Sequence, residues 1–423
     1  MRGPKPFRIF LMVILALTPL AQVFWFGQAW QVIAAVAWSG PRYLLQALWM
    51  AAGLLVLATV LDLLIGPINL RRGFGPWGVA VSRLWLIASG ISYVAVTAVG
   101  SVAWLSQPAI AALPGIPWEG LEPATSLVFH AATYLAGSIP MLATVYGATV
   151  GRRRYRIVSV EVPIAALCSS LDGLRIVQLS DLHIGGFMSR MAIRRAVDLA
   201  NSLQADLAVV TGDLITDAHD PLEDCIAELS RLRAPLGVWG CNGNHERWAG
   251  LEARAQALFQ RYGMGLLRQQ AVELSWRGGT FNLIGVDDQR DRHSADQPPM
   301  LHGIEALVRP DIPNILLSHN PDTFTRAAAL GIELSLAGHT HGGQIRFALG
   351  DRQWSPALFL TPFVAGLYRL PLRQAAHTAG HEVTPRCHTF AYLYVNRGLG
   401  TFGLPVRLGV PPEITLLTLR AAE

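Results

Sequence analysis

The sequence predicts an N-terminal α-helical membrane region followed by an α/β domain. Apolar residues make up 52% of the chain and charged residues only 15%, against roughly 25% charged residues in an ordinary soluble domain. The uncharged runs gather before residue 151, and short β-branched runs alternate with amphipathic stretches after residue 157. Composition and pattern therefore divide the chain into a membrane region, 1–151, and an α/β domain, 157–423.

The membrane region is predicted from four long uncharged runs. Residues 1–150 hold seven basic and three acidic side chains, whereas the remaining residues hold 27 and 26. Each run is long enough for the roughly 20 residues that cross a bilayer. A cleaved signal peptide would explain only the first run. We predict transmembrane helices at about 9–30, 43–65, 84–105 and 126–149.

The arginines predict the orientation of these spans. Basic residues precede the first span, lie between the second and third, and follow the fourth in the sequence GRRRYR at 151–156. The positive-inside rule then places both termini and the α/β domain in the cytoplasm, at a bacterial-type inner (plasma) membrane. The alternative places the catalytic domain on the outer face. Because GRRRYR directly follows a predicted span, we interpret it as a topology signal that lies near lipid head groups. We therefore expect no nucleic-acid partner.

Lysine and cysteine usage excludes several classes of chemistry. Lys5 is the single lysine, which leaves none for a Schiff base or a P-loop. The four cysteines are widely spaced, which indicates free thiols rather than a zinc ribbon or a disulfide scaffold. They are Cys168, Cys225, Cys241 and Cys387.

The pattern after residue 157 is typical of βαβ units. Strands are expected at 174–180, 206–213, 236–244, 282–288, 314–320 and 333–343, with helices near 188–203, 221–233, 250–262 and 321–330. Open α/β sheets bind ligands beyond the carboxyl ends of their strands. The residues at those ends are therefore the candidate functional residues.

Five polar clusters follow these strands, and together they predict a metal site. They are DLH (181–183), GD (212–213), GNHE (243–246), His319 and GHTH (338–341). Carboxylate and amide oxygens mixed with imidazoles suit Mn, Fe, Co or Zn, whereas a set without thiolates argues against a structural zinc site. In an extended DxH or HxH the side chains at i and i+2 point the same way, so each motif would direct both groups into one pocket.

The five clusters, in this order, resemble the motifs of the calcineurin-like metallophosphoesterase superfamily. LAGHTHGGQ, VNRGLGT (395–401) and PPEITLLTL (411–419) further resemble its YkuE-like branch. The resemblance covers 157–423 and not the membrane region. It implies an α+β sandwich and a hydrolase that uses two divalent metal ions, manganese among the candidates.

The resemblance also implies a role for each residue. One metal would be bound by Asp181, His183 and His341, the other by Asn244, His319 and His339, with Asp213 bridging the two. His245 would protonate the leaving alkoxide while a metal-activated hydroxide attacks phosphorus. Glu246 would position His245, or form a surface salt bridge. Gly343 and Gln344 would let the backbone approach substrate, or serve the structure alone.

The substrate is the least determined feature. The bond that the predicted enzyme hydrolyses belongs to a phosphomonoester, a phosphodiester or a pyrophosphate. The apolar segment 354–370 is either a buried strand or loop, or a hydrophobic wall beside the metals that binds an acylated substrate. The second alternative is suggested by YkuE-like relatives that resemble UDP-diacylglucosamine pyrophosphatases of lipid metabolism. Nucleotides and phosphoproteins are alternatives.

A different class of function also stays open, in which the helices form a transporter or receptor and the α/β domain is a regulatory binding module. The expected partners are the lipid bilayer and a phosphoester substrate. The sequence makes no prediction of oligomeric state.

Overall fold

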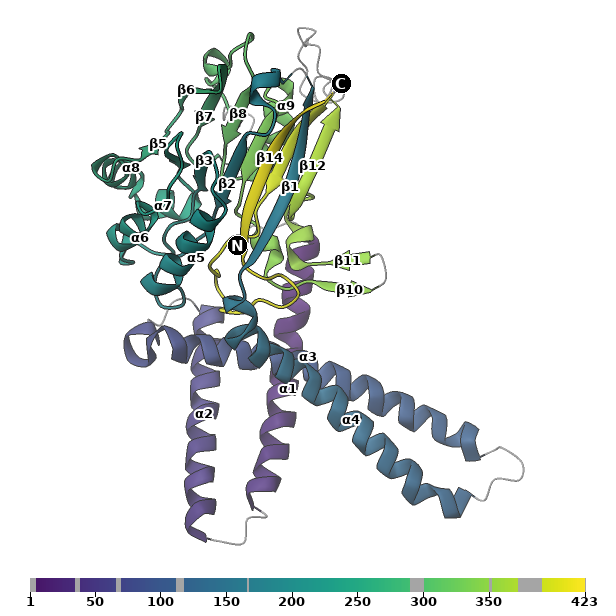
Figure 1. Ribbon diagram of the computed structural model, residues 1–423. Coiled ribbons are helices and arrows are strands. Elements are labelled where there is room, and N and C mark those ends of the chain that lie inside the picture. Colours follow the sequence, from purple (N-terminus) through teal and green to yellow (C-terminus); the bar gives the residue numbers. More distant parts are fainter. Residues whose placement is uncertain are drawn as a thin grey trace. The chain divides into compact units, whose positions relative to one another are not determined.

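The computed structural model describes residues 5–34, 39–65, 70–111, 118–165, 167–289, 300–349, 352–371 and 390–422. The chain divides into two compact units, Met1–Thr149 and Val150–Glu423. Figure 1 shows the helices of the first unit and the sheets of the second.

The described residues of the first unit form four long helices. They are α1 (Lys5–Ala34), α2 (Ser39–Ile65), α3 (Leu70–Ala111) and α4 (Trp118–Thr149), and each predicted span falls within one of them. In this part of the chain two stretches, Ser39–Thr59 and Gly78–Val102, are long and apolar enough to cross a membrane. The prediction of four spans is therefore not confirmed, and the structure identifies two candidates, in α2 and α3.

Polar side chains connect the helices of the first unit. Gln22 of α1 donates to Ser89 Oγ of α3 at 2.7 Å and accepts from the Trp85 indole of α3 at 2.7 Å. Thr59 of α2 and Ser82 of α3 share a buried hydrogen bond of 2.6 Å. These side-chain hydrogen bonds link α1 and α2 to α3.

The second unit contains two six-stranded sheets, as the α/β prediction requires. The first has the order β1-β14-β2-β3-β4-β5 and the second β12-β13-β9-β8-β7-β6. The strands of the first are β1 (Arg156–Ala165), β14 (Glu413–Ala422), β2 (Arg175–Leu179), β3 (Leu207–Thr211), β4 (Val238–Cys241) and β5 (Gly265–Leu266); those of the second are β12 (Gly366–Pro371), β13 (Phe390–Val395), β9 (Leu334–Ala337), β8 (Asn314–Leu317), β7 (Gly279–Gly285) and β6 (Gln270–Trp276). A two-stranded ribbon joins β10 (Phe347–Leu349) to β11 (Arg352–Trp354).

Both sheets are mixed, with parallel strands at their centres. In the first sheet β2, β3, β4 and β5 are parallel, and β14 runs antiparallel to β2. In the second, β7, β8, β9 and β13 are parallel, with β6 and β12 antiparallel at the edges. The alternation in the sequence predicted the parallel strands, but not the pairing of β1 with β14 from the opposite end of the chain.

Alternating side chains of the central strands build the layers. Ile176 and Val209 of the first sheet join the core shared with Leu283, Ile315 and Leu336 of the second. Their neighbours along the strands point to the opposite face, because the side-chain period of a strand is two. Those neighbours pack on α5 (Arg190–Ser202), α6 (Leu222–Leu229) and α8 (Glu252–Arg261) on one side, and on α9 (Phe324–Ala329) on the other.

Candidate metal centre

The predicted site residues lie just beyond the carboxyl ends of strands from both sheets. Asp181 and His183 follow β2, Asp213 follows β3, and Asn244 begins the short helix α7 (Asn244–Ala249) after β4. From the second sheet, His319 follows β8, and His339 and His341 follow β9. The donors thus come from both sheets of the sandwich that the resemblance implied.

The backbone at these residues differs from the prediction. Asp181, His183, Asp213, His339 and His341 all have positive φ, between +48° and +72°, so DxH and HxH are not extended. Left-handed backbone is costly for residues other than glycine, and such strain gathers at functional sites. The paired side chains converge because the backbone makes tight left-handed turns at these residues. The prediction that an extended backbone directs side chains i and i+2 to the same side is therefore wrong.

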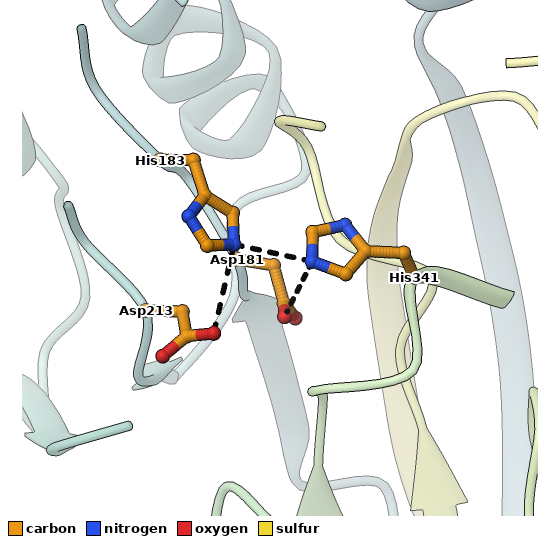
Figure 2. Close-up of side chains that lie close together, drawn as sticks. All are labelled: Asp181, His183, Asp213 and His341. Carbon is orange, nitrogen blue, oxygen red and sulfur yellow. Dashed lines mark hydrogen bonds and ion pairs between the residues drawn. The ribbon is translucent and has the colours of Figure 1, made fainter. Parts of the chain in front are cut away.

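Asp181, His183, Asp213 and His341 direct their side chains toward one another, as Figure 2 shows. His183 Nε2 lies 3.1 Å from His341 Nε2, and His341 Nε2 lies 3.3 Å from Asp181 Oδ1. His183 Nε2 lies 3.5 Å from Asp213 Oδ2. Donors that share one divalent ion lie roughly 3.0–3.4 Å apart. These four residues are arranged as a metal site.

A second group shares Asp213 with the first. Asp213, His319 and His339 place ligand atoms close enough to hold one ion, and His319 Nε2 lies 3.1 Å from Asp213 Oδ2. The side chain of Asn244, which begins α7, is buried, and its Oδ1 has no hydrogen-bond partner within the described part of the chain. A buried acceptor without a donor is costly, and a bound cation would satisfy it. The donors fit two ions with Asp213 between them.

Hydrogen bonds orient two of the imidazoles. His319 Nδ1 donates to the Thr211 carbonyl at 2.6 Å, so its Nε2 faces Asp213. His183 Nδ1 lies 3.2 Å from Thr216 Oγ1, which leaves Nε2 directed toward His341. Such outer contacts select the ring nitrogen that binds a metal.

Burial and charge prepare the donors for a cation. Burial lowers the pKa of His183 to about 3 and that of His341 well below its usual value, so both are neutral, the form that binds metals. Burial opposes ionisation of Asp213, but the imidazoles around it outweigh that effect and hold its pKa well below the usual range. His319 differs, because burial lowers its pKa but the Asp213 carboxylate outweighs this effect and raises that pKa to about 10, so a metal ion must displace the Nε2 proton to bind there.

His245 lies beside the shared carboxylate without joining either donor group. Its Nδ1 donates to the Thr216 carbonyl at 2.7 Å, and its Nε2 lies 3.9 Å from Asp213 Oδ2. The side chain is 4% exposed. Its free Nε2 is therefore the nitrogen available for proton transfer.

Glu246 is fully buried and binds backbone amides, so the predicted surface salt bridge is wrong. Its Oε2 accepts from the N–H of Asp213 (3.0 Å) and of Gly243 (2.8 Å). Its Oε1 accepts from Leu214 (2.8 Å) and Ile215 (3.2 Å). Burial, and next the Asp213 carboxylate, raise the pKa of Glu246 to about 7, while the N–H groups act in the opposite direction. Glu246 holds the loop of Asp213 to the loop of Asn244, whereas the sequence predicted that it positions His245.

Gly343 and Gln344 both contact other parts of the fold, in agreement with the structural alternative. A Cβ at Gly343 would overlap Ser355 Oγ, and the residue has φ of +77°. The Gln344 side chain donates to the Phe402 carbonyl at 2.9 Å and accepts from the Phe402 N–H at 2.8 Å. Gln344 therefore fixes the backbone of Phe402 beside the site.

The apolar segment 354–370 lies against the histidine loop. The carbonyl of Val364 accepts from Thr340 Oγ1, between the two histidines of GHTH, at 2.6 Å. Ala357 and Val364 are buried, whereas Leu358 and Leu360 are about half exposed. The segment thus supports the site with one face, and neither of the two predicted alternatives describes it alone.

Sequence reasoning missed four contributing residues. Thr216 holds His183 and His245, and the aromatic rings of Trp248 and Phe402 contact the His245 ring. Arg407 is buried and donates to the carbonyls of the loop after β13, which hydrogen-bonds to the Asp181 backbone. Burial lowers the pKa of Arg407 to about 10. The phrase VNRGLGT marked this loop, but nothing in it indicated a buried guanidinium.

Comparisons with known proteins agree with this geometry. Residues 174–343 match a family described as calcineurin-like phosphoesterase. A transmembrane protein with metallophosphoesterase domain from Bos taurus is 32% identical over 335 residues, covering 76% of this chain and 67% of that protein. A protein of the same description from Danio rerio is 31% identical, covering 69% and 63%. The uncharacterized metallophosphoesterase YkuE of Bacillus subtilis is 30% identical, covering 60% and 81%.

The chain thus spans about two thirds of the length of the two vertebrate relatives. The bovine similarity covers more of the chain than residues 157–423 provide, so it extends into the helical region, contrary to the expectation that similarity stops at the membrane region.

Proposed function

Since the chain belongs to the calcineurin-like phosphoesterase family, whose members use two divalent metal ions, we propose that it is a membrane-anchored hydrolase of phosphomonoester, phosphodiester or pyrophosphate bonds with a dinuclear centre. The observation that supports this most is the sharing of Asp213 by two convergent donor groups. Two-metal sites of this kind clamp phosphoryl oxygens and generate hydroxide near neutral pH.

Each residue has a proposed task. Asp181, His183 and His341 would hold one ion, Asn244, His319 and His339 the other, and Asp213 both. In the reaction a water that has released one proton to solvent forms a bond through its oxygen to phosphorus, and the bond from phosphorus to the leaving oxygen breaks. The leaving oxygen takes the Nε2 proton of His245, which begins the step with both ring nitrogens protonated. The Thr216 carbonyl keeps Nδ1 protonated, so His245 returns to its neutral form with its remaining proton in place.

The helical region is proposed to anchor this centre in a membrane through all four helices. The α2 and α3 stretches meet the length and composition required. Leu135, Ile139 and Leu142 of α4 and Val23 of α1 are each at least 64% exposed, and exposed apolar rows on long helices are typical of lipid-facing surfaces. The arginines at 152–156 favour a cytoplasmic catalytic domain.

Hydrolysis by the full-length protein in detergent tests the proposed activity. We expect p-nitrophenyl phosphate or its bis-ester to be cleaved with Mn, Fe, Zn or Co and not after EDTA. Asp213→Asn should abolish cleavage, because it removes the shared carboxylate, whereas Asp172→Asn at an exposed site serves as the matched control. Silence with every metal and both esters would refute the proposed function.

Cysteine labelling tests the orientation. Cys168 is exposed, whereas Cys225 and Cys241 are buried, so Cys168 is the accessible probe. Cys387 lies outside the described residues and would be replaced by serine. In intact spheroplasts a membrane-impermeant maleimide should label Cys168 only after lysis. Labelling before lysis would place the domain on the outer face. Cys168→Ser is the control.

A further inference from the structure

Two exposed aromatic rings stand beside the proton donor of an otherwise polar site. Trp248 is 58% exposed and Phe402 46% exposed. The Trp248 ring centroid lies 4.7 Å from that of His245, and the Phe402 centroid lies 4.8 Å from it at 68°. Phe402 also stacks on His183, at 6.0 Å and 29°. Each ring uses part of its surface on the imidazoles and leaves the rest open to solvent.

Polar contacts fix the backbone that carries each ring. Gln344 binds both the N–H and the carbonyl of Phe402, and the same carbonyl accepts from the Leu404 N–H at 2.8 Å. Trp248 lies on α7, two residues after the buried Glu246 that anchors this helix. Fixing an apolar surface before a ligand arrives reduces the entropy lost on binding.

The position of the rings identifies the part of the substrate that they meet. His245 gives its proton to the leaving oxygen under the proposed function, and both rings contact the His245 ring. A group attached to that oxygen would therefore lie next to Trp248 and Phe402. We propose that these two side chains form a binding surface for an apolar group on the leaving alcohol, so that the enzyme prefers phosphate esters of apolar alcohols over those of small polar ones. This inference rests on the proposed function.

Alkyl phosphates measure the preference without changing the chemistry of the leaving oxygen. We would compare kcat/KM for ethyl, butyl and hexyl phosphate and for 2-phenylethyl phosphate, using the full-length protein in one detergent. Full burial of a methylene corresponds to about a fourfold gain. With partial burial on two open rings, we expect hexyl phosphate to exceed ethyl phosphate by about tenfold. A larger gain for the phenylethyl ester than for the hexyl ester would identify an aromatic rather than an aliphatic group as the preferred ligand.

The variants separate a binding surface from simple packing. Trp248→Ala and Phe402→Ala should each lower the hexyl-to-ethyl ratio about threefold, and the double variant should bring it close to one. Gln344→Ala should lower the ratio as Phe402→Ala does, because Gln344 is a positioning residue for that ring. Trp248→Phe and Phe402→Leu keep apolar surface and should retain most of the preference, and Ile157→Ala, an exposed apolar residue of β1, is the unrelated control.

The outcomes distinguish the two proposals. Hydrolysis of all esters with no chain-length preference, or a preference unchanged in the double variant, would overturn the inference and leave the phosphoesterase assignment intact. Absence of hydrolysis for every ester and metal would overturn the proposed function and this inference with it. Melting curves of each variant, together with competitive inhibition by ethyl- and hexylphosphonate, show whether a lost preference reflects lost binding rather than unfolding.

Discussion

The buried Glu246 carboxylate offers the sharpest test of how the site is held together. Its two oxygens accept hydrogen bonds from the N–H groups of Asp213, Gly243, Leu214 and Ile215. In Glu246→Gln the amide oxygen can still accept from two of these donors, but the NH₂ group faces the other two. Each buried donor without an acceptor costs about 1–3 kcal/mol. The charge of the buried carboxylate offsets part of this cost, because burial and Asp213 raise its pKa to about 7 and the ionised form is therefore disfavoured in the folded state. We expect a net loss of about 2 kcal/mol in the free energy of unfolding.

Thermal unfolding measures this loss. At pH 8 the carboxylate is ionised, and EDTA removes the contribution of bound metal to stability. For a unit of this size 1 kcal/mol corresponds to about 2–4 °C, so the full-length protein in detergent should melt about 6 °C lower. Glu161→Gln is the matched control, because that carboxylate also has an ion pair but is 66% exposed, and we expect its melting temperature to change little. A Glu246→Gln protein that melts within about 2 °C of the wild type would refute the view that this carboxylate holds the two loops.

Two further predictions concern the metal centre and the surface of the domain. Asn244→Ala should reduce bound metal from two ions to about one per chain, as measured by mass spectrometry after dialysis. The melting temperature in EDTA should change little, because Asn244 Oδ1 has no protein partner among the described residues. Two ions retained would contradict this prediction, and Asn201→Ala on α5 is the control. Glu228 is hydrogen-bonded first to Arg194 and then to Arg190 and Arg231, which lower its pKa to about 2. Because that pKa is depressed, the stabilisation is present above the ordinary value of 4.5 and is lost as pH falls toward 2. After allowance for the half-exposed arginines, Glu228→Gln should cost about 1–2 kcal/mol at pH 7. The melting temperatures of variant and wild type should approach each other as pH falls from 4.5 toward 2, and a gap that stays constant with pH would count against the ion pairs.

The sequence was sufficient for the chemistry of the site because donor type is a local property. Asp213 and His319 were identified from their place after apolar runs, and the structure brings their ligand atoms together across two sheets. The parallel central strands were also accessible, since each is a short apolar run with a helix after it. The composition of the first 150 residues likewise indicated long apolar helices before any contact was known.

Only the tertiary structure decided how these pieces act together. The pairing of β1 with β14 joins residues more than 250 positions apart, and no local periodicity encodes such a pairing. The left-handed backbone at Asp181 and His341 follows from turns imposed by the surrounding loops. The contacts of Glu246 with four amides and of Gln344 with Phe402 depend on loops that are distant in the chain. The chemical type of each side chain can be read directly from the sequence. The spatial arrangement of these side chains depends on long-range contacts that form only in the folded chain.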